Sequence, residues 1–161
     1  MRTLIVYYSR TGTTATIARA LASRLDANMA EITCARYSGG IWRYLLAGYD
    51  SVRGNLPEIV MPVFDSDEYD LLLVGTPVWT SYPALPIRAF LDRKPELPGR
   101  IAVFLTHGGH SPPQTCIDKL AEWLPVPIEA KLACNSAQVT AGKYSDEVND
   151  FATKLEKQSS K

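Results

Sequence analysis

The sequence predicts an α/β fold, namely a doubly wound parallel sheet of five strands in the order 2-1-3-4-5 with helices on both faces. Short apolar runs of the kind buried inside a parallel sheet alternate with segments of helical periodicity. The chain has 161 residues, of which 46% are apolar and 21% charged, the size and balance of one globular domain. Alternating strands and helices give parallel strands joined by right-handed crossovers, and 2-1-3-4-5 is a common order for five strands.

Short-range patterns predict the first two strands and the helix between them. Residues 2–8 contain a continuous apolar run and form the first strand. Residues 13–25 form a helix, because their apolar residues recur every three to four positions. Residues 29–34 are predicted as a short second strand, in which polar residues alternate with apolar ones as an edge strand permits.

The connection over residues 35–69 is long enough to contain structure of its own. Trp42, Leu45 and Tyr49 recur at helical spacing, which predicts a helix over residues 41–53. Its aromatic side chains are expected to pack in the core. The alternative is that one of them forms a rim to a ligand site.

The clearest strand covers residues 71–75, a run buried on both faces of the sheet. It is expected to stop at residues 76–83, because two prolines and two large aromatic residues do not suit a central strand. The remaining elements are predicted as helices over 84–93, 113–124 and 145–156 and strands over 101–105 and 128–133, followed by a polar tail over 157–161.

Composition restricts the partners and the compartment. Seventeen basic and seventeen acidic residues cancel, so no overall field favours nucleic acid or an anionic membrane. The amino terminus enters a strand without a charged and apolar leader, and no apolar run approaches the roughly 18 residues of a membrane span. We therefore expect one cytoplasmic domain over residues 1–161 with no membrane segment.

The three cysteines, Cys34, Cys116 and Cys134, are expected to be reduced packing residues. Their odd number and the absence of a C-x-x-C pair argue against a disulfide framework and against a zinc site. His107 and His110 stand three residues apart, but no carboxylate or cysteine nearby completes a metal ligand set. No metal site is predicted.

The stretch between the first strand and the first helix is the strongest candidate for a ligand site. It consists of Ser9, Arg10, Thr11, Gly12, Thr13 and Thr14. A strand that passes through hydroxyls and a glycine into a helix presents N–H groups and a positive dipole end to one small volume, which suits a phosphate. The guanidinium of Arg10 is able to contact phosphate oxygens. The alternative is an ordinary turn with a capping hydroxyl. With one glycine, the loop fits neither a nucleoside-triphosphate loop nor a dinucleotide fingerprint.

Two further loops are expected beside this stretch. In the predicted order the first, third and fourth strands are neighbours, and such sheets bind ligands at the carboxyl ends of their strands. Residues 76–82 offer Trp79 and Tyr82, on which a planar ring is able to stack. Residues 106–111 offer two adjacent glycines, whose backbone is able to approach and hydrogen-bond the polar edge of a ring. Phosphate, plane and polar edge together describe flavin mononucleotide (FMN).

The sequence resembles the flavodoxin family. The phosphate loop of that family reads Ser/Thr-x-Thr-Gly-Asn/Thr-Thr, which residues 9–14 match, and the likeness extends through residues 75–79 and 106–109. The final strand carries no insertion, as in the short-chain flavodoxins. The resemblance implies FMN as the cofactor and identifies no catalytic residue. The cofactor-binding residues that it implies, together with their neighbours in the three loops, are Ser9, Arg10, Thr11, Gly12, Thr13, Thr14, Thr76, Pro77, Val78, Trp79, Thr80, Tyr82, Thr106, His107, Gly108 and Gly109.

Three features depart from the family pattern. Dedicated carriers in the family tend to be strongly acidic, whereas this chain is neutral. The residue after the ring-stacking tryptophan is often Gly or Asn, which permits a peptide flip that stabilises one-electron-reduced flavin; here it is Thr80, for which positive φ is costly. An aromatic residue that often covers the other flavin face is missing, and His107 and His110 stand nearby. They are either exposed loop residues, or His107 lies against the flavin or a substrate and handles protons.

The resemblance leaves two main functions open. The first is an FMN-binding protein that transfers electrons to or from a redox partner protein, as a monomer or weak homodimer. The alternative is an NAD(P)H-dependent FMN oxidoreductase that reduces quinone-like small molecules. A flavin-free domain that binds another phosphate ligand is a third. A response regulator would have aspartates where Ser9 and Thr76 stand, and a low-molecular-weight tyrosine phosphatase would have a cysteine in the first loop.

Overall fold

The centre of the computed structural model, which describes residues 1–38, 40–109 and 112–159, is a parallel sheet in the order β2-β1-β3-β5-β6. A short strand, β4, pairs with the end of β3 in an antiparallel hairpin. The predicted fold class and strand order are confirmed, because β5 and β6 are the fourth and fifth strands of the parallel sheet. The bounds are β1 Thr3–Tyr7, β2 Asn28–Glu31, β3 Leu71–Trp79, β4 Tyr82–Pro83, β5 Ile101–His107 and β6 Ile128–Asn135.

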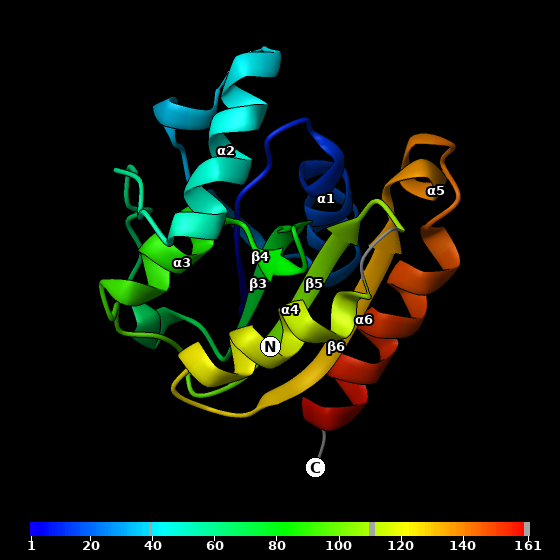
Figure 1. The fold of residues 1–161 in the computed structure, drawn as a ribbon. Coiled ribbons are helices and arrows are strands. Elements are labelled where there is room, and N and C mark those ends of the chain that lie inside the picture. Colours follow the sequence, from blue (N-terminus) through cyan, green and yellow to red (C-terminus); the bar gives the residue numbers. More distant parts are fainter. Residues whose placement is uncertain (39, 110–111, 160–161) are drawn as a thin grey trace.

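Helices cover both faces of the sheet. Helices α1, α5 and α6 pack on one face and α3 and α4 on the other, while α2 rises beyond α3 at the end where the strands finish (Figure 1). Both chain termini lie at the opposite end of the molecule. The bounds are α1 Thr13–Leu25, α2 Ile41–Arg53, α3 Leu85–Asp92, α4 Pro113–Trp123, α5 Ser136–Thr140 and α6 Ser145–Ser159, with short 3-10 helices η1 Ala35–Tyr37 and η2 Ser66–Glu68.

Two apolar clusters hold the layers together, because successive side chains of a strand point to opposite faces. Leu4 and Val6 face the cluster under α3 and α4, whereas Ile5 and Tyr7 face the cluster under α1 and α6. Gly75 of β3 leaves room for the ring of Phe104 on β5, since a Cβ at that position would overlap the ring. The prediction of central strands buried on both faces is confirmed.

The main error in the predicted elements is the end of the third strand. β3 continues to Trp79 instead of stopping at Thr76. β1 ends opposite Gly75, so beyond that point β3 has no parallel neighbour on that side, and an edge tolerates Pro77. The fourth strand likewise extends to His107, so that Thr106 and His107 belong to β5 rather than to the following loop.

The second strand is shorter than expected. It ends at Glu31, and Thr33 instead forms an isolated antiparallel bridge with Val60. The short helix α5 was not predicted. The three cysteines are free and buried, as expected; burial raises the pKa of Cys116 to about 12.

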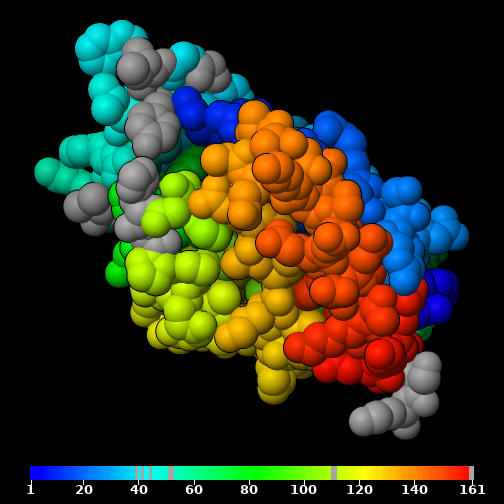
Figure 2. All heavy atoms as spheres, turned by 90° about the vertical axis from the view of Figure 1, so that its right-hand side faces the viewer, coloured from blue at the N-terminus to red at the C-terminus, as the bar shows by residue number. Residues whose placement is uncertain are grey.

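Figure 2 shows α5 and α6 in front, with α1 on one side of them, the region of α4 on the other, and side chains of α2 standing clear at one corner. Within the residues that the structure describes, no helix combines the length and apolar character that a membrane crossing demands.

Candidate functional site

Three loops lie together at the carboxyl ends of β1, β3 and β5, a region called here the carboxyl edge. Thr14 in the first turn of α1 and Thr106 at the end of β5 lie far apart in sequence, yet a buried hydrogen bond of 2.7 Å joins their hydroxyl oxygens. The N–H of Tyr8, just after β1, donates to the carbonyl of Gly75 at 3.1 Å. The structure thus brings together the three predicted loops.

The loop that precedes α1 gathers hydrogen-bond donors. Gly12 is the N-cap of α1, with a φ of 90° in the left-handed region, and it offers no side chain to cap the helix. The N–H of Ala15 donates to Ser9 Oγ at 3.1 Å. The hydroxyls of Thr11 and Thr13 lie 3.4 Å apart at the surface. Ser9 thus occupies one N–H of the first turn, and the other first-turn N–H groups, the hydroxyls and the positive end of the helix are a donor set for an anion.

On the other side of the carboxyl edge, Trp79 makes edge-to-face contacts with two aromatic rings. Its ring centroid lies 5.7 Å from that of Tyr8 and 5.4 Å from that of Tyr37, with interplanar angles of 88° and 89°. Edge-to-face packing of this kind is favourable for aromatic pairs. Burial raises the pKa of Tyr8 and of Tyr37, so both phenols are neutral at physiological pH. Trp79 itself is half-buried and has a fixed orientation.

The β3–β4 hairpin turns through two residues with positive φ. Thr80 has a φ of 47° and Ser81 a φ of 71°. Two consecutive left-handed residues in a two-residue hairpin match the twist of the flanking strands, although glycine and asparagine are the usual occupants. Thr80 therefore adopts the backbone conformation that was expected to be costly for it, and the surrounding contacts maintain it.

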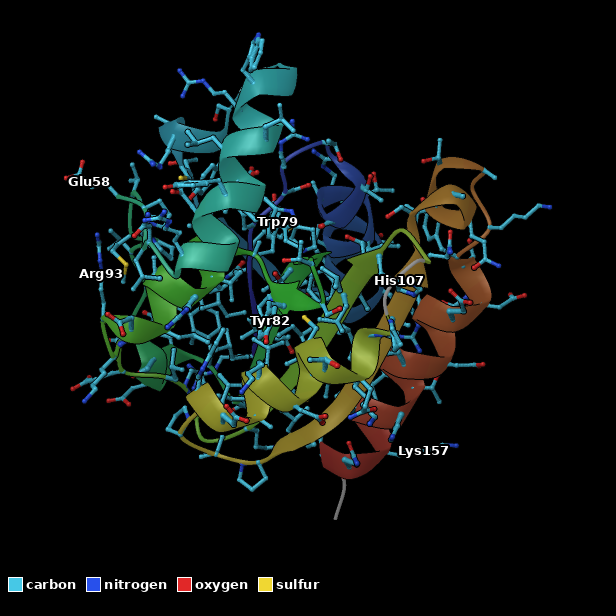
Figure 3. The ribbon with its side chains drawn as sticks, viewed as in Figure 1. Glu58, Trp79, Tyr82, Arg93, His107 and Lys157 are labelled. Carbon is cyan, nitrogen blue, oxygen red and sulfur yellow. The ribbon has the colours of Figure 1, made fainter. Side chains whose placement is uncertain are left out.

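Thr76 closes the base of this hairpin. Its fully buried hydroxyl accepts a hydrogen bond from the N–H of Ala84 at 2.9 Å and donates to the carbonyl of Pro77 at 3.0 Å. Val78 and Trp79 are half-buried, whereas the Tyr82 side chain is 45% exposed at the rim. Trp79 and Tyr82, labelled in Figure 3, pair across the hairpin on either side of its two-residue turn.

The loop after β5 is shaped by a histidine and a glycine. His107 Nδ1 accepts a hydrogen bond from the N–H of Gly109 at 3.2 Å. Gly109 has a φ of 85°, and a Cβ there would lie 3.1 Å from Asn135 Nδ2. His110 lies outside the described residues. Among those residues, no three side chains of metal-binding type lie close enough to hold an ion.

A buried carboxylate that the sequence analysis missed supports Trp79. Asp50 of α2, with a fully buried side chain, accepts hydrogen bonds from Arg36 Nε at 2.7 Å, Arg36 Nη2 at 3.2 Å, the Tyr37 hydroxyl at 2.9 Å and Asn55 Nδ2 at 3.3 Å. The hydrogen bond from Arg36 is the main reason why the pKa of Asp50 is lowered. The network fixes Tyr37, whose ring contacts Trp79. The one sequence signal is an aspartate within an amphipathic helix.

Helix α2 exposes three large apolar residues, while Leu46 packs against the core. Trp42 is 80% exposed, and Leu45 and Tyr49 are more than half exposed. The expectation that these residues pack in the core is wrong, because the inward side of α2 is formed by Ala47 and the hydrogen-bonded Asp50. The exposed residues stand next to the carboxyl edge.

The fold recurs in solved structures. A flavoprotein from Lactobacillus acidophilus NCFM in complex with FMN superposes with a TM-score of 0.72 at 28% identity, over 87% of this chain and 97% of that one. The chain has the flavodoxin-like fold. A flavoprotein described as putative, from Bacteroides uniformis ATCC 8492, gives a TM-score of 0.74 at 23% identity, covering 94% of this chain and 97% of its own. Oxidised Flavodoxin 2 from Bacillus cereus gives 0.62 at 14% identity, covering 98% and 99% of the two chains.

The chain resembles these proteins more in structure than in amino-acid sequence. No protein-family model matches the chain, and a search of curated proteins finds no match. Within the flavodoxin-like fold, the predicted site residues that the structure describes lie at the carboxyl edge in three groups. Ser9 to Thr14 lie at the start of α1, Thr76 to Tyr82 in the β3–β4 hairpin and Thr106 to Gly109 at the end of β5. Their roles toward a ligand stay predictions.

Proposed function

We propose that the carboxyl edge binds FMN and that the protein is a redox protein which transfers electrons to or from a partner. One observation carries this proposal: an anion-binding helix start, a fixed tryptophan and a glycine-containing loop lie at one edge of the sheet, linked by the Thr14–Thr106 hydrogen bond. The likeness to a flavoprotein crystallised with FMN supports the same cofactor here.

The residues present fit the three parts of FMN. The start of α1, where the N-cap Gly12 carries no side chain, and the surface hydroxyls of Thr11 and Thr13 would hold the phosphate. Trp79 offers a half-buried ring of fixed orientation on which the isoalloxazine would stack. The backbone between Thr106 and Gly109 would hydrogen-bond the polar edge of that ring.

The chain itself contributes binding, orientation and exclusion of water. Bound FMN supplies the capacity to accept and release electrons. The Asp50 network and the rings of Tyr8 and Tyr37 keep Trp79 from rotating, so its ring is preorganised before the cofactor arrives. Thr14 and Thr106, which are buried and hydrogen-bonded to each other, connect the first loop to the third and would keep the two loops in place for the cofactor.

The test of the cofactor proposal is the absorption spectrum of the purified protein, before and after incubation with FMN and dialysis. We expect a flavin spectrum, and we expect Thr11→Ala and Gly12→Val to weaken FMN binding by at least about tenfold, since each removes a phosphate contact or its backbone geometry. Gly99→Val is the matched control, because Gly99 is exposed, has no positive φ and has open space around its Cβ position. Equal FMN retention in Gly12→Val and Gly99→Val contradicts the phosphate site.

A second candidate function is an NAD(P)H-dependent oxidoreductase that reduces quinone-like small molecules. Two observations favour it: the chain has no net charge with which to attract a protein partner, and α2 places exposed apolar side chains beside the carboxyl edge, as a wall for a small apolar substrate would.

Anaerobic reduction separates the two functions. An electron-transfer protein is expected to bleach in two one-electron stages with long-wavelength absorption between them, and to need a reductase. An oxidoreductase is expected to bleach in one two-electron stage on addition of NADPH, and to pass those two electrons to an added quinone. Trp79→Ala is expected to shift the reduction potential in either case, because the ring against the flavin is lost.

A further inference from the structure

A groove beside the β3–β4 hairpin brings together two arginines and two aromatic rings. Arg53 and Gly54 from the end of α2, Tyr82 of β4, Arg88 of α3 and Trp123 of α4 line it. Tyr82 is paired with Trp79 across the hairpin, so the groove and the proposed FMN site share this hairpin. None of its residues belongs to the phosphate loop or to the glycine loop.

The two guanidinium groups are positioned against rings. Arg53 lies over the Tyr49 ring with its Cζ 5.1 Å from the centroid, and Arg88 lies over the Trp123 ring at 5.4 Å. A Cβ built on Gly54 would lie 3.6 Å from Arg88 Nη1, which places this guanidinium against the end of α2. Cation–π contacts orient an arginine without neutralising it.

Neither arginine forms an ion pair within the described part of the chain. A second hollow adjoins the groove at Arg88 and Trp123, and it adds Lys94 and one carboxylate, Asp92. The linings of the two hollows thus contain three cations, Arg53, Arg88 and Lys94, and one carboxylate, Asp92, in a molecule whose net charge is zero.

We propose that this groove binds a planar aromatic molecule that carries an anionic group, and that it is the substrate subsite of the redox protein proposed above. Tyr82 and Trp123 offer surfaces for the ring, and the forked donors of Arg53 and Arg88 bind a sulfonate, carboxylate or phosphate. Two sources have this chemistry: an aromatic acid that acts as electron acceptor, and the nucleotide phosphate of a pyridine-nucleotide donor. The role of the groove as a substrate subsite rests on the proposed function, whereas the binding of an aromatic anion does not.

Isothermal titration calorimetry on the purified protein tests the proposal with four probes. Naphthalene-2-sulfonate has ring and charge, 2-naphthol has the ring alone, inorganic sulfate has the charge alone, and NADP+ represents the nucleotide. We expect naphthalene-2-sulfonate to bind at least about tenfold more tightly than either single-feature probe. Binding of NADP+ through the same arginines identifies the nucleotide as the ligand, whereas sulfonate binding alone identifies an aromatic acid.

Variants at the two arginines connect the binding to the groove. Arg88→Gln and Arg53→Gln are each expected to weaken naphthalene-2-sulfonate binding by about tenfold, the loss of one charged hydrogen bond. Arg93→Gln is the matched control, since Arg93 follows α3, lies at the outer edge of the molecule away from Tyr82 in Figure 3, and does not line the groove. Circular dichroism verifies that the variants are folded.

Several results overturn the proposal: no binding of any ring-bearing anion to the folded protein, 2-naphthol binding as tightly as the sulfonate, or an equal effect of Arg88→Gln and Arg93→Gln. FMN retention is measured on the same samples. A protein that binds FMN but not the anions refutes the groove and leaves the proposed function standing. If the protein binds the anions through Arg88 but does not retain FMN, the groove is confirmed as an anion site and the proposed function is refuted.

Discussion

The two sides of the carboxyl edge reach their shapes by different means. The loop before α1 places its left-handed residue on glycine, Gly12, with a φ of 90°. The β3–β4 hairpin places two such residues on Thr80 and Ser81, which both have a Cβ. Left-handed backbone is open to glycine but costs about 1–2 kcal/mol for other L-residues. The first loop is therefore relaxed by its own sequence, whereas the hairpin needs support from its neighbours.

That support comes from far along the chain. Thr76 hydrogen-bonds Ala84 at the base of the hairpin, and the rings of Tyr37 and Tyr8 both contact Trp79. Asp50 in turn fixes Tyr37 by a hydrogen bond of 2.9 Å. The loop before α1 is therefore shaped by its own sequence. The β3–β4 hairpin depends on residues from distant parts of the chain that belong to no common sequence motif.

Removal of the buried carboxylate should break the hairpin side most severely. Asp50→Ala leaves the buried Tyr37 hydroxyl without its acceptor and Arg36 without its partner, so we expect the free energy of unfolding to fall by about 3 kcal/mol. Urea denaturation monitored by tryptophan fluorescence measures it. Asp150→Ala, at an exposed position on α6, is the control. Equal destabilisation by the two variants would show that the network contributes nothing special.

The same carboxylate makes stability depend on pH. Hydrogen bonds, first of all from Arg36, lower the pKa of Asp50 in the folded state below its unfolded value of about 3.9. The stabilisation is therefore fully present above that unfolded value and is lost as the pH falls toward the folded pKa. Between pH 7 and pH 3, the difference in unfolding free energy between parent and Asp50→Asn is expected to shrink below about pH 4. If this difference in unfolding free energy did not change with pH, protonation of Asp50 would not contribute to the loss of stability in acid.

In the loop before α1, a substitution of Gly12 is expected to have a smaller effect on stability. Gly12→Ala forces a Cβ into left-handed backbone without any steric clash, since no heavy atom lies within 4 Å of that position. The free energy of unfolding should fall by about 1 kcal/mol, the conformational cost alone. The equivalent measurement on Gly99→Ala should show no loss. A decrease much larger than the conformational cost would mean that the loop depends on contacts, as the hairpin does.

The loop before α1, whose shape depends on neighbouring residues, could be predicted from the sequence. A glycine among hydroxyls between an apolar strand and a helical pattern predicts both the turn and an anion site, and the bounds predicted for α1 agree with the structure. The central strands also have a local signal, because residues buried on both faces of a sheet form an unbroken apolar run. Their order followed from a general rule on parallel sheets.

The other side depends on contacts that periodicity does not encode. Asp50 and Arg36 meet because η1 and α2 pack together, and nothing in the local pattern distinguishes this aspartate from a solvated one. Trp42 looked like a core residue because an amphipathic pattern identifies an apolar face but not whether that face is covered. The end of β3 was misjudged because proline is excluded from central strands, whereas Pro77 lies where the neighbouring strand has already ended.

The smallest expected effect has the opposite sign. Thr80→Gly removes the Cβ from a residue with a φ of 47°, which relieves strain of about 1–2 kcal/mol, while the added glycine raises the entropy of the unfolded chain at a cost of about 0.5–1 kcal/mol. The net stabilisation should be about 0.5 kcal/mol, measured by urea denaturation. Thr153→Gly within α6 is the control and should destabilise the protein by up to about 1 kcal/mol. If Thr80→Gly destabilised the protein as much as Thr153→Gly does, the threonine would be making contacts that outweigh its strain, and the hairpin would be as well matched to its sequence as the loop at Gly12.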